Sequence, residues 1–272
     1  MNLSEEDIAP FEYEEAYKTI LSAESEGLNN VFKKARNILC IQPHPDDTDL
    51  AAGGLVAKLA EQGCEITYVT MTDGRIGTLN PEISPEKLAV IRVNEQKEAA
   101  KILGVKNLIW LNYKDSELKP TLEARNRLIS VIRKFKPNVI LTVDPWLTYE
   151  AHPDHIATGI LVAEATFFAM LPHANPSDIE NGLKPHMVEF IAFYWTKKPN
   201  LYIDITDYME IKLKAVASHK SQFPPETFEE LESQLRLYSR LMGKKIGVKY
   251  AEAFKVLSFK HLHCCIYAED LQ

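Results

Sequence analysis

The sequence predicts an α/β protein whose strands form a mostly parallel sheet. From residue 37 onward, short apolar runs alternate with longer amphipathic stretches, which is typical of repeated βαβ units. The run at residues 139–143 is almost wholly apolar, as expected of a central strand buried on both faces. The chain has 272 residues, 46% hydrophobic and 25% charged, so it can bury a core without disulfides or a structural metal.

The first elements have clear boundaries. Gly63 and Gly104 follow two helical stretches, because glycine readily adopts the left-handed conformation at a helix end. Ser84 and Pro85 predict an N-cap and first turn, and Pro137 terminates a further helix. The strands are expected at residues 38–41, 66–71, 108–111 and 139–143. The helices are expected at residues 48–62, 84–104, 122–136 and 153–171.

The remainder of the chain is less regular. Strands are expected at residues 187–194 and 201–205, and helices at 208–220 and 228–242. Residues 172–185 predict a long loop, 255–267 have no definite type, and a helix is expected at 14–23. Since no internal repeat is present, we expect an N-terminal helical arm (1–36) followed by a single domain (37–272) with C-terminal decorations.

Charge and cysteine content restrict the class of partner. The 31 basic and 38 acidic residues give a net charge of −7, which disfavours nucleic acid and anionic membrane surfaces. We therefore expect no nucleic-acid or membrane partner, and a small-molecule partner instead. The cysteines form no CxxC spacing, and the N-terminus is acidic where a signal peptide would be basic. These features predict a cytoplasmic location. The cysteines are Cys40, Cys64, Cys264 and Cys265.

The loop after the first strand carries a cluster of acids instead of a nucleotide-binding motif. Neither a GxGxxG nor a P-loop pattern follows this strand, and the chain has no GxSxG nucleophile elbow. The loop reads HPDD, with His44, Asp46 and Asp47, and Asp49 follows closely. Helix capping accounts for one or two of these acids. It does not account for the histidine or for adjacent carboxylates, which repel each other unless a cation lies between them.

A second cluster, HPDH at residues 152–155, follows the fourth strand and begins a helix. Ligands of open α/β sheets bind beyond the carboxyl ends of the strands, where both clusters are expected, so we predict one shared metal site. Spacing alone does not select its ligands. One carboxylate must stay off the metal to take a proton from metal-bound water, and a second group must stabilise the oxyanion. The candidates are His44, Asp46, Asp47, His152, Asp154 and His155.

The paired HPDD and HPDH motifs resemble the PIG-L/LmbE-like family of zinc-dependent deacetylases, which act on N-acetylglucosamine conjugates. The resemblance covers nearly the whole chain. It extends to Thr72-Asp73-Gly74, to Arg92 with Glu95, to Pro185-His186, and to the segment from Lys212 to Gln222. The chain departs from many members of the family at Thr48 and Arg75, which bears on the substrate and not on the reaction.

The resemblance implies a role for each matching residue. Zn²⁺ would be held by His44, Asp47 and His155, and Asp46 would be the general base. His152, oriented by Asp154, would stabilise the oxyanion or act as the acid. Arg92, with Asp73 nearby, would bind an N-acetylated sugar conjugate. The resemblance also implies a Rossmann-like fold, with helices on both faces of the sheet, and a homo-oligomer, either a trimer or a hexamer.

Several alternatives stay open at this point. The donor set also suits iron, cobalt or nickel. The chain could hydrolyse a different amide, or could be a non-catalytic module that binds a metal or a sugar. For His219 we favour a structural role over a catalytic one, because a lone histidine late in a helix is more often structural. A terminal strand is the favoured interpretation of the cluster His261, His263, Cys264 and Cys265. Trp146 is mainly a core candidate that could instead form a wall of a sugar site.

Overall fold

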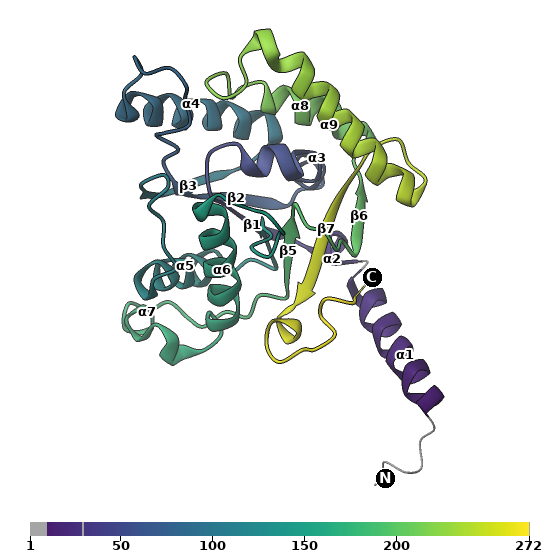
Figure 1. Ribbon diagram of the computed structural model, residues 1–272. Coiled ribbons are helices and arrows are strands. Elements are labelled where there is room, and N and C mark those ends of the chain that lie inside the picture. Colours follow the sequence, from purple (N-terminus) through teal and green to yellow (C-terminus); the bar gives the residue numbers. More distant parts are fainter. Residues whose placement is uncertain (1–9, 29, 272) are drawn as a thin grey trace.

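The protein, described here as a computed structural model, is built on one seven-stranded sheet with strand order β3-β2-β1-β4-β5-β7-β6 (Figure 1). The structure describes residues 10–28 and 30–271, so the first nine residues of the predicted arm lie outside it. Strands β1 to β5 pair in parallel, whereas β7 is antiparallel to both β5 and β6. The predicted mostly parallel α/β architecture is confirmed.

Strands β1 to β6 agree with the predicted runs to within a few residues, whereas β7 lies where no definite strand was predicted. All five residues of β4 are buried, as expected of a central strand. The strands are β1 (Asn37–Gln42), β2 (Glu65–Thr72), β3 (Asn107–Tyr113), β4 (Val139–Val143), β5 (Phe190–Tyr194), β6 (Leu201–Asp204) and β7 (Ala251–Ser258).

Helices cover both faces of the sheet. In Figure 1, α3, α4, α8 and α9 lie above it, and α5, α6 and α7 lie below. Their bounds are α3 (Asp47–Glu61), α4 (Pro85–Leu103), α5 (Leu122–Phe135), α6 (Pro153–Phe168), α7 (Pro176–Glu180), α8 (Met209–Val216) and α9 (Pro225–Ile246). Before β1 come α1 (Pro10–Leu28) and α2 (Val31–Lys34). Short 3-10 turns occupy Pro172–Ala174, Thr206–Tyr208 and Phe259–Leu262.

The predicted helix signals act as expected at several ends. The Ser84 side chain accepts a hydrogen bond from the backbone N–H of Lys87, which caps α4. Gly104, at the other end of α4, has a φ of 78°. Helix α6 ends at Phe168, three residues before the predicted end at 171, and a 3-10 turn that begins with Pro172 follows it.

The interpretation of the C-terminal histidines and cysteines as part of a strand is wrong. Strand β7 ends at Ser258, where the backbone N–H donates to His261 Nδ1 at 3.0 Å and closes a 3-10 turn. His261 is therefore buried in that turn. Cys264 lies beyond it, exposed, with a φ of 54°. Because these residues follow the strand, strand alternation does not place them on one side.

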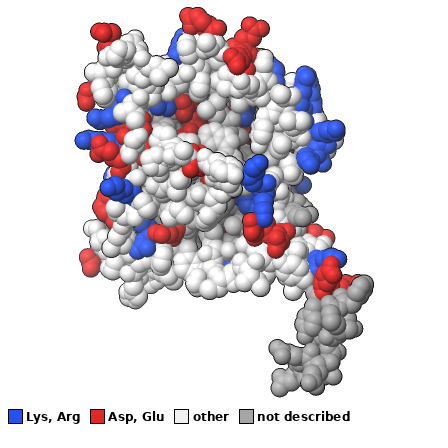
Figure 2. Space-filling view, in the orientation of Figure 1, with Lys and Arg blue, Asp and Glu red and all other residues white. Residues whose placement is uncertain are grey.

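Helix α1 extends away from the sheet in Figure 1, and its last residue, Leu28, is buried in the main core. The division of the chain at residue 36 into an arm and a domain stays a prediction. On the face shown in Figure 2, acidic and basic side chains are interspersed around a largely uncharged centre. Among the helices of the described residues, none has the length and apolarity that crossing a bilayer requires.

Candidate metal and catalytic site

The site forms where β1 and β4 lie side by side and the loops that follow them meet. From this pair the sheet grows in opposite directions, through β2 and β3 on one side and through β5 on the other. Ligands of open α/β sheets usually bind at such a point. After β1, Asp46 takes a left-handed conformation with a φ of 107° and is the N-cap of α3. After β4, His152 is the N-cap of α6. The two motifs predicted to share a site are therefore brought together.

Three of the predicted residues converge as a possible metal site. One ligand atom from each of His44, Asp47 and His155 lies within 4.8 Å of the others. His44 Nδ1 is 3.4 Å from Asp47 Oδ2, and His155 Nε2 is 3.5 Å from Asp47 Oδ1. Ligand atoms about 2.1 Å from a tetrahedral ion lie roughly 3.4 Å from one another, so these separations fit an ion between them. The donor set of two imidazoles and one carboxylate suits zinc and other divalent transition metals.

A second set of potential ligands surrounds the far side of His44. It consists of His44, Asp115, His152 and Asp154. Asp154 is fully buried, and its two carboxylate oxygens accept the backbone N–H groups of Ser116 at 2.7 Å and Leu118 at 3.2 Å. Both Asp154 oxygens therefore have backbone donors, whereas in Asp47 only Oδ2 has one, the N–H of His44 at 2.8 Å, so we favour the set that contains Asp47 and His155.

The charges around His44 are predominantly negative. Burial alone would lower the pKa of His44, but hydrogen bonds to Asp115, Asp154 and Asp47 outweigh it and raise that pKa well above its usual value. Burial likewise would raise the pKa of Asp47, yet His155 and His44 hold it at about 2. Asp47 is therefore charged beside a His44 that favours its protonated form, and a cation bound by both would take the place of that proton.

Asp46 lies beside these ligands and is held by side chains of α4. Its carboxylate accepts a hydrogen bond from Arg92 Nη2 at 3.1 Å, and its backbone N–H donates to Gln96 Oε1 at 3.0 Å. Burial raises the pKa of Asp46 to about 6, against the opposing charge of Arg92. Asp46 is therefore a buried carboxylate whose orientation is fixed, as expected of a general base.

Arg92, predicted to bind the substrate, is buried against the loop that carries Asp46. It is 4% exposed, and its guanidinium donates to the carbonyl oxygens of Pro45 at 2.6 Å and Gly74 at 3.0 Å as well as to Asp46. Gly74, with a φ of 61°, allows this approach, because a Cβ there would lie 2.5 Å from Arg92 Nη1. Both terminal nitrogens of Arg92 thus donate to Asp46 or to the loops beside it, whereas its buried Nε has no hydrogen-bond partner.

Asp73 is likewise occupied by the protein. Its Oδ2 lies 2.7 Å from Arg75 Nη2, and its Oδ1 is within hydrogen-bond distance of the backbone N–H of Asp115 at 3.3 Å. Arg75 is one of the two departures from the family pattern, and its charge neutralises the carboxylate expected to contact the substrate. The other departure, Thr48, is buried and donates its backbone N–H to Gln42 Oε1.

The carboxylate of Asp154 lies against His44, not against His152 as expected. His44 Nε2 and Asp154 Oδ2 are 3.1 Å apart. His152 Nδ1 instead accepts the backbone N–H of Asp154 at 3.3 Å, because this histidine caps the helix that Asp154 begins. Burial and the neighbouring His44 and His155 lower the pKa of His152.

Asp115 is a site residue that sequence reasoning missed. It is buried, and its Oδ1 lies 3.3 Å from His44 Nε2 and 3.9 Å from His152 Nε2. It has no motif, but it follows the third strand by two residues and so stands at the same edge of the sheet. That position, a carboxylate just after a strand end, is the signal that could have identified it.

The late motif that includes His219 supports the site from outside. His219 is fully buried and its Nε2 is 2.8 Å from Asp49 Oδ2, as the structural interpretation expects. Gln222 donates to the carbonyl oxygen of Gly77, and Glu95 accepts two hydrogen bonds from Ser221. These contacts join the segment after α8 to α3, to α4 and to the loop between β2 and α4.

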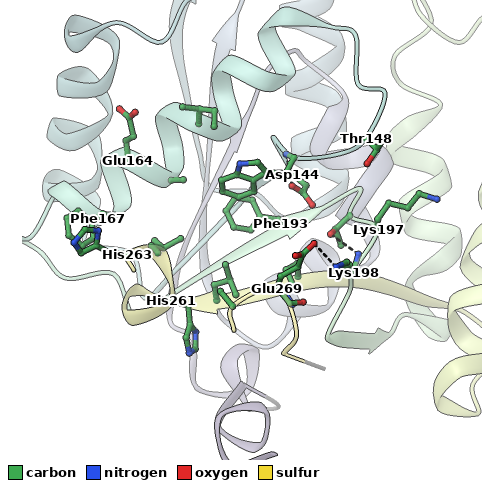
Figure 3. Close-up of a pocket in the computed structure, with 18 of the residues that line it drawn as sticks. Asp144, Thr148, Glu164, Phe167, Phe193, Lys197, Lys198, His261, His263 and Glu269 are labelled. Atoms are coloured by element: carbon green, nitrogen blue, oxygen red, sulfur yellow. Dashed lines mark hydrogen bonds and ion pairs between the residues drawn. The ribbon is translucent and has the colours of Figure 1, made fainter. Parts of the chain in front are cut away.

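A cavity lies next to the loop that follows β4, and no predicted catalytic, substrate-binding or metal-binding residue lines it. It has a volume of about 810 Å³ and is bounded by α6, the strands β5 and β7 and the C-terminal segment. Figure 3 shows Phe193 on its wall and the ion pair of Lys198 with Glu269 at its edge. Trp146 also lines it and is 60% exposed, so Trp146 is not a core residue.

The central part of the chain matches a known family. The family model described as "PIG-L: GlcNAc-PI de-N-acetylase" matches residues 39–166, which include both motifs. A diacetylchitobiose deacetylase from Thermococcus kodakarensis is 43% identical over 256 residues, which cover 94% of this chain and 96% of that relative. A probable N-acetyl-alpha-D-glucosaminyl L-malate deacetylase 2 from Bacillus anthracis is 31% identical over 212 residues, with coverage of 72% and 86%.

A solved structure shares the whole fold. The N,N'-diacetylchitobiose deacetylase from Pyrococcus horikoshii, solved in complex with an inhibitor, superposes with a TM-score of 0.89. The two chains are 45% identical, and the match covers 96% of this chain and 98% of the other.

Proposed function

Since the chain belongs to the PIG-L/LmbE-like family of N-acetylglucosamine deacetylases, we propose that it hydrolyses the acetamide of an N-acetylglucosamine conjugate with a bound zinc ion. One observation carries the metal-dependent mechanism. His44, Asp47 and His155 offer ligand atoms within 4.8 Å of one another, while Asp46 beside them is held off the cluster by Arg92. The site thus has a set of metal ligands and a separate carboxylate.

His44, Asp47 and His155 would hold the ion. When bound, a divalent metal supplies Lewis-acid chemistry: it polarises a carbonyl oxygen and lowers the pKa of water. Metal analysis of the purified protein distinguishes zinc from iron, cobalt and nickel.

Asp46 is the general base in this proposal. Its carboxylate takes a proton from the water that attacks the acetamide carbon, and the carbonyl oxygen gains the negative charge. The tetrahedral species then collapses: the C–N bond breaks, the nitrogen takes a proton, and acetate and a free amine are released. Arg92 keeps the Asp46 carboxylate oriented for the proton transfer, which is the role we propose for it in place of substrate binding.

His152 stabilises the oxyanion or donates the proton that the leaving nitrogen needs. It is the most exposed histidine of the cluster, with 36% of its side chain accessible, so a substrate can reach it. Its Nδ1 accepts the backbone N–H of Asp154, so the proton of the neutral ring is on Nε2, the nitrogen that would face the substrate. Asp154 fixes His44 instead.

The substrate class follows from the relatives. Those that match nearly the full chain at 43% and 45% identity are diacetylchitobiose deacetylases, whereas the L-malate deacetylase 2 matches 72% of it at 31%. We therefore propose a short N-acetylglucosamine oligosaccharide of the diacetylchitobiose type as the substrate.

An amine-release assay tests the proposed function. The panel contains N,N'-diacetylchitobiose, N-acetylglucosamine, an N-acetylglucosamine–malate conjugate and N-acetyl amino acids, each with and without a chelator. We expect turnover of the sugars, fastest for the disaccharide, which the chelator abolishes and added zinc restores. Turnover confined to N-acetyl amino acids would establish a hydrolase of another amide. Full metal occupancy without turnover of any of them would establish a non-catalytic binding module.

We also propose a cytoplasmic homo-oligomer. The support is the family resemblance and the four cysteines, all of which are free. Light scattering on the purified protein measures its mass against the 30.9 kDa chain, and cell fractionation tests the location.

A further inference from the structure

Glu150 belongs to neither motif, but in space its carboxylate contacts both histidines of the HPDH motif, His152 and His155. Its Oε1 accepts the backbone N–H of His152 at 2.8 Å, and its Oε2 lies 3.3 Å from His155 Nδ1. The side chain is 17% exposed, so most of it is withdrawn from solvent. One carboxylate therefore contacts both the backbone of His152 and the ring of a proposed metal ligand.

The loop before Glu150 is bent in a way that delivers this carboxylate inward. Tyr149 has a φ of 71°, a left-handed conformation that is unfavourable for a residue with a bulky side chain. Tyr149 as a whole residue is 98% exposed. The backbone N–H of Glu150 closes the turn on the carbonyl oxygen of Leu147 at 3.1 Å. The strained residue, Tyr149, thus points outward while the Glu150 side chain points toward His155. Backbone strain of this kind persists at functional sites.

His155 needs a partner for the nitrogen that faces Glu150. Its Nε2 points at Asp47, on the side of the proposed metal. Within the part of the chain that the structure describes, Nδ1 is buried without a well-aligned hydrogen bond, and Glu150 is the carboxylate within 4.0 Å of it. Trp195 stacks on the ring at 5.7 Å with an angle of 8°, which packs the face of the ring and leaves Nδ1 to Glu150.

The same arrangement surrounds His44 with the nitrogens exchanged. His44 Nδ1 faces Asp47, and its Nε2 lies 3.1 Å from Asp154. Each imidazole thus presents one nitrogen to the proposed metal and has a carboxylate behind the other. A carboxylate behind a metal-binding histidine sets which nitrogen carries the proton and fixes the direction of the ring.

We propose that Glu150 is a positioning residue that keeps the proton of His155 on Nδ1, so that Nε2 is free to bind the metal. This inference rests on the proposed function, since it assigns a support to one of the three proposed ligands. By also accepting the His152 N–H, the same carboxylate couples the ring that holds the metal to the backbone of the residue that contacts the substrate.

A glutamine at this position cannot do the same. The N–H of His152 and the Nδ1–H of His155 are two donors that converge on two carboxylate oxygens. A carboxamide has a single acceptor oxygen, and its NH₂ group would face one of the donors. Glu150→Gln therefore keeps the size of the side chain and removes one of the two contacts.

The test measures zinc affinity on metal-free protein by competition with a chromophoric chelator. We expect Glu150→Gln to weaken zinc binding by about 10- to 100-fold, as is usual when such a support is removed. The ¹⁵N NMR signals of the His155 ring report its tautomer, and we expect the share of the Nδ1–H form to fall in metal-free Glu150→Gln. The melting temperature of the metal-free protein should stay close to that of the wild type.

Glu164→Gln is the matched control, because it replaces a glutamate by glutamine at a site on α6 where the side chain is 44% exposed. It should leave zinc affinity and the His155 signals unchanged. His155→Ala and Asp47→Ala separate the two claims. If both weaken zinc binding while Glu150→Gln alters neither affinity nor tautomer, or only lowers the melting temperature, the positioning role is overturned and the metal site stands. If His155→Ala and Asp47→Ala bind zinc as the wild type does, the proposed metal site itself fails.

Discussion

Arg92 donates a hydrogen bond to the Asp46 carboxylate at 3.1 Å, and each side chain is less than one-tenth exposed. The same guanidinium holds the carbonyl oxygens of Pro45 and Gly74, so it ties the turn after β1 to the loop after β2. A buried arginine with several fixed acceptors orients the base and keeps it charged. In the proposed mechanism, Arg92 therefore acts on the substrate only through Asp46.

Arg92→Lys tests that role. A lysine keeps the charge but cannot reproduce the planar set of donors, so the carbonyl oxygens of Pro45 and Gly74 lose partners. We expect kcat for deacetylation to fall by at least tenfold with KM within about threefold of the wild type, because the base is displaced and the substrate contacts are kept. The stability to urea should fall by about 1–3 kcal/mol. A large rise in KM with kcat unchanged would instead establish substrate binding by Arg92.

Arg133 is a structural arginine, and its replacement should affect stability without affecting the site. It is fully buried in α5 and donates to the carbonyl oxygens of Ala169, Leu171 and Asn175 and to the Asp178 carboxylate. Arg133→Met removes one donor from each of these acceptors and leaves the buried Asp178 carboxylate without its counter-charge, so we expect a loss of about 3–5 kcal/mol in the free energy of unfolding.

The control for this prediction is Arg127→Met on the same helix, where 41% of the side chain is exposed. It should cost at most about 1 kcal/mol. Urea denaturation followed by circular dichroism measures both variants. Equal losses in the two would show that the segment from Ala169 to Asp178 does not depend on Arg133.

Two helical glycines should respond to alanine in opposite directions. A Cβ at Gly54 in α3 would lie 2.8 Å from two side-chain carbons of Ile205, whereas a Cβ at Gly27 in α1 would meet nothing within 4 Å. Gly54→Ala should therefore lower the free energy of unfolding by about 1–2 kcal/mol through overpacking. Gly27→Ala should raise it by about 0.5–1 kcal/mol, the usual preference of a helix for alanine. Thermal denaturation of the two variants measures the signs, and the same sign in both would contradict the packing at Ile205.

The sheet could be predicted where the pattern is local. Alternating apolar runs and helix-end residues such as Gly104 and Pro137 locate the elements from β1 to α6, because each signal acts within a few residues. The pairing of β7 between β5 and β6 could not be predicted, since it joins segments that are not neighbours in the sequence. The strand expected around His261 failed for a related reason: the end of β7 is set by a turn that Ser258 and His261 close with each other.

The site, too, could be predicted from the sequence only in part. The motifs place His44, Asp47 and His155 at strand ends, and the parallel sheet then brings these ends together. Asp115 and Glu150 have no motif, because each reaches its histidine from a loop whose path depends on tertiary contacts. The expected role of Asp154 did not anticipate its contact with His44, 110 residues away in sequence.

The most direct test of the central claim, that one carboxylate stays off the metal, is the zinc content and deacetylation rate of Asp46→Asn measured on the same sample. The account predicts zinc bound to the same stoichiometry as in the wild type, with turnover of N,N'-diacetylchitobiose lower by about 10²–10⁴. Asp47→Ala, measured alongside, should lose the zinc. Loss of zinc from Asp46→Asn to the same extent, or turnover at the wild-type rate, would contradict the assignment of Asp46 as the base.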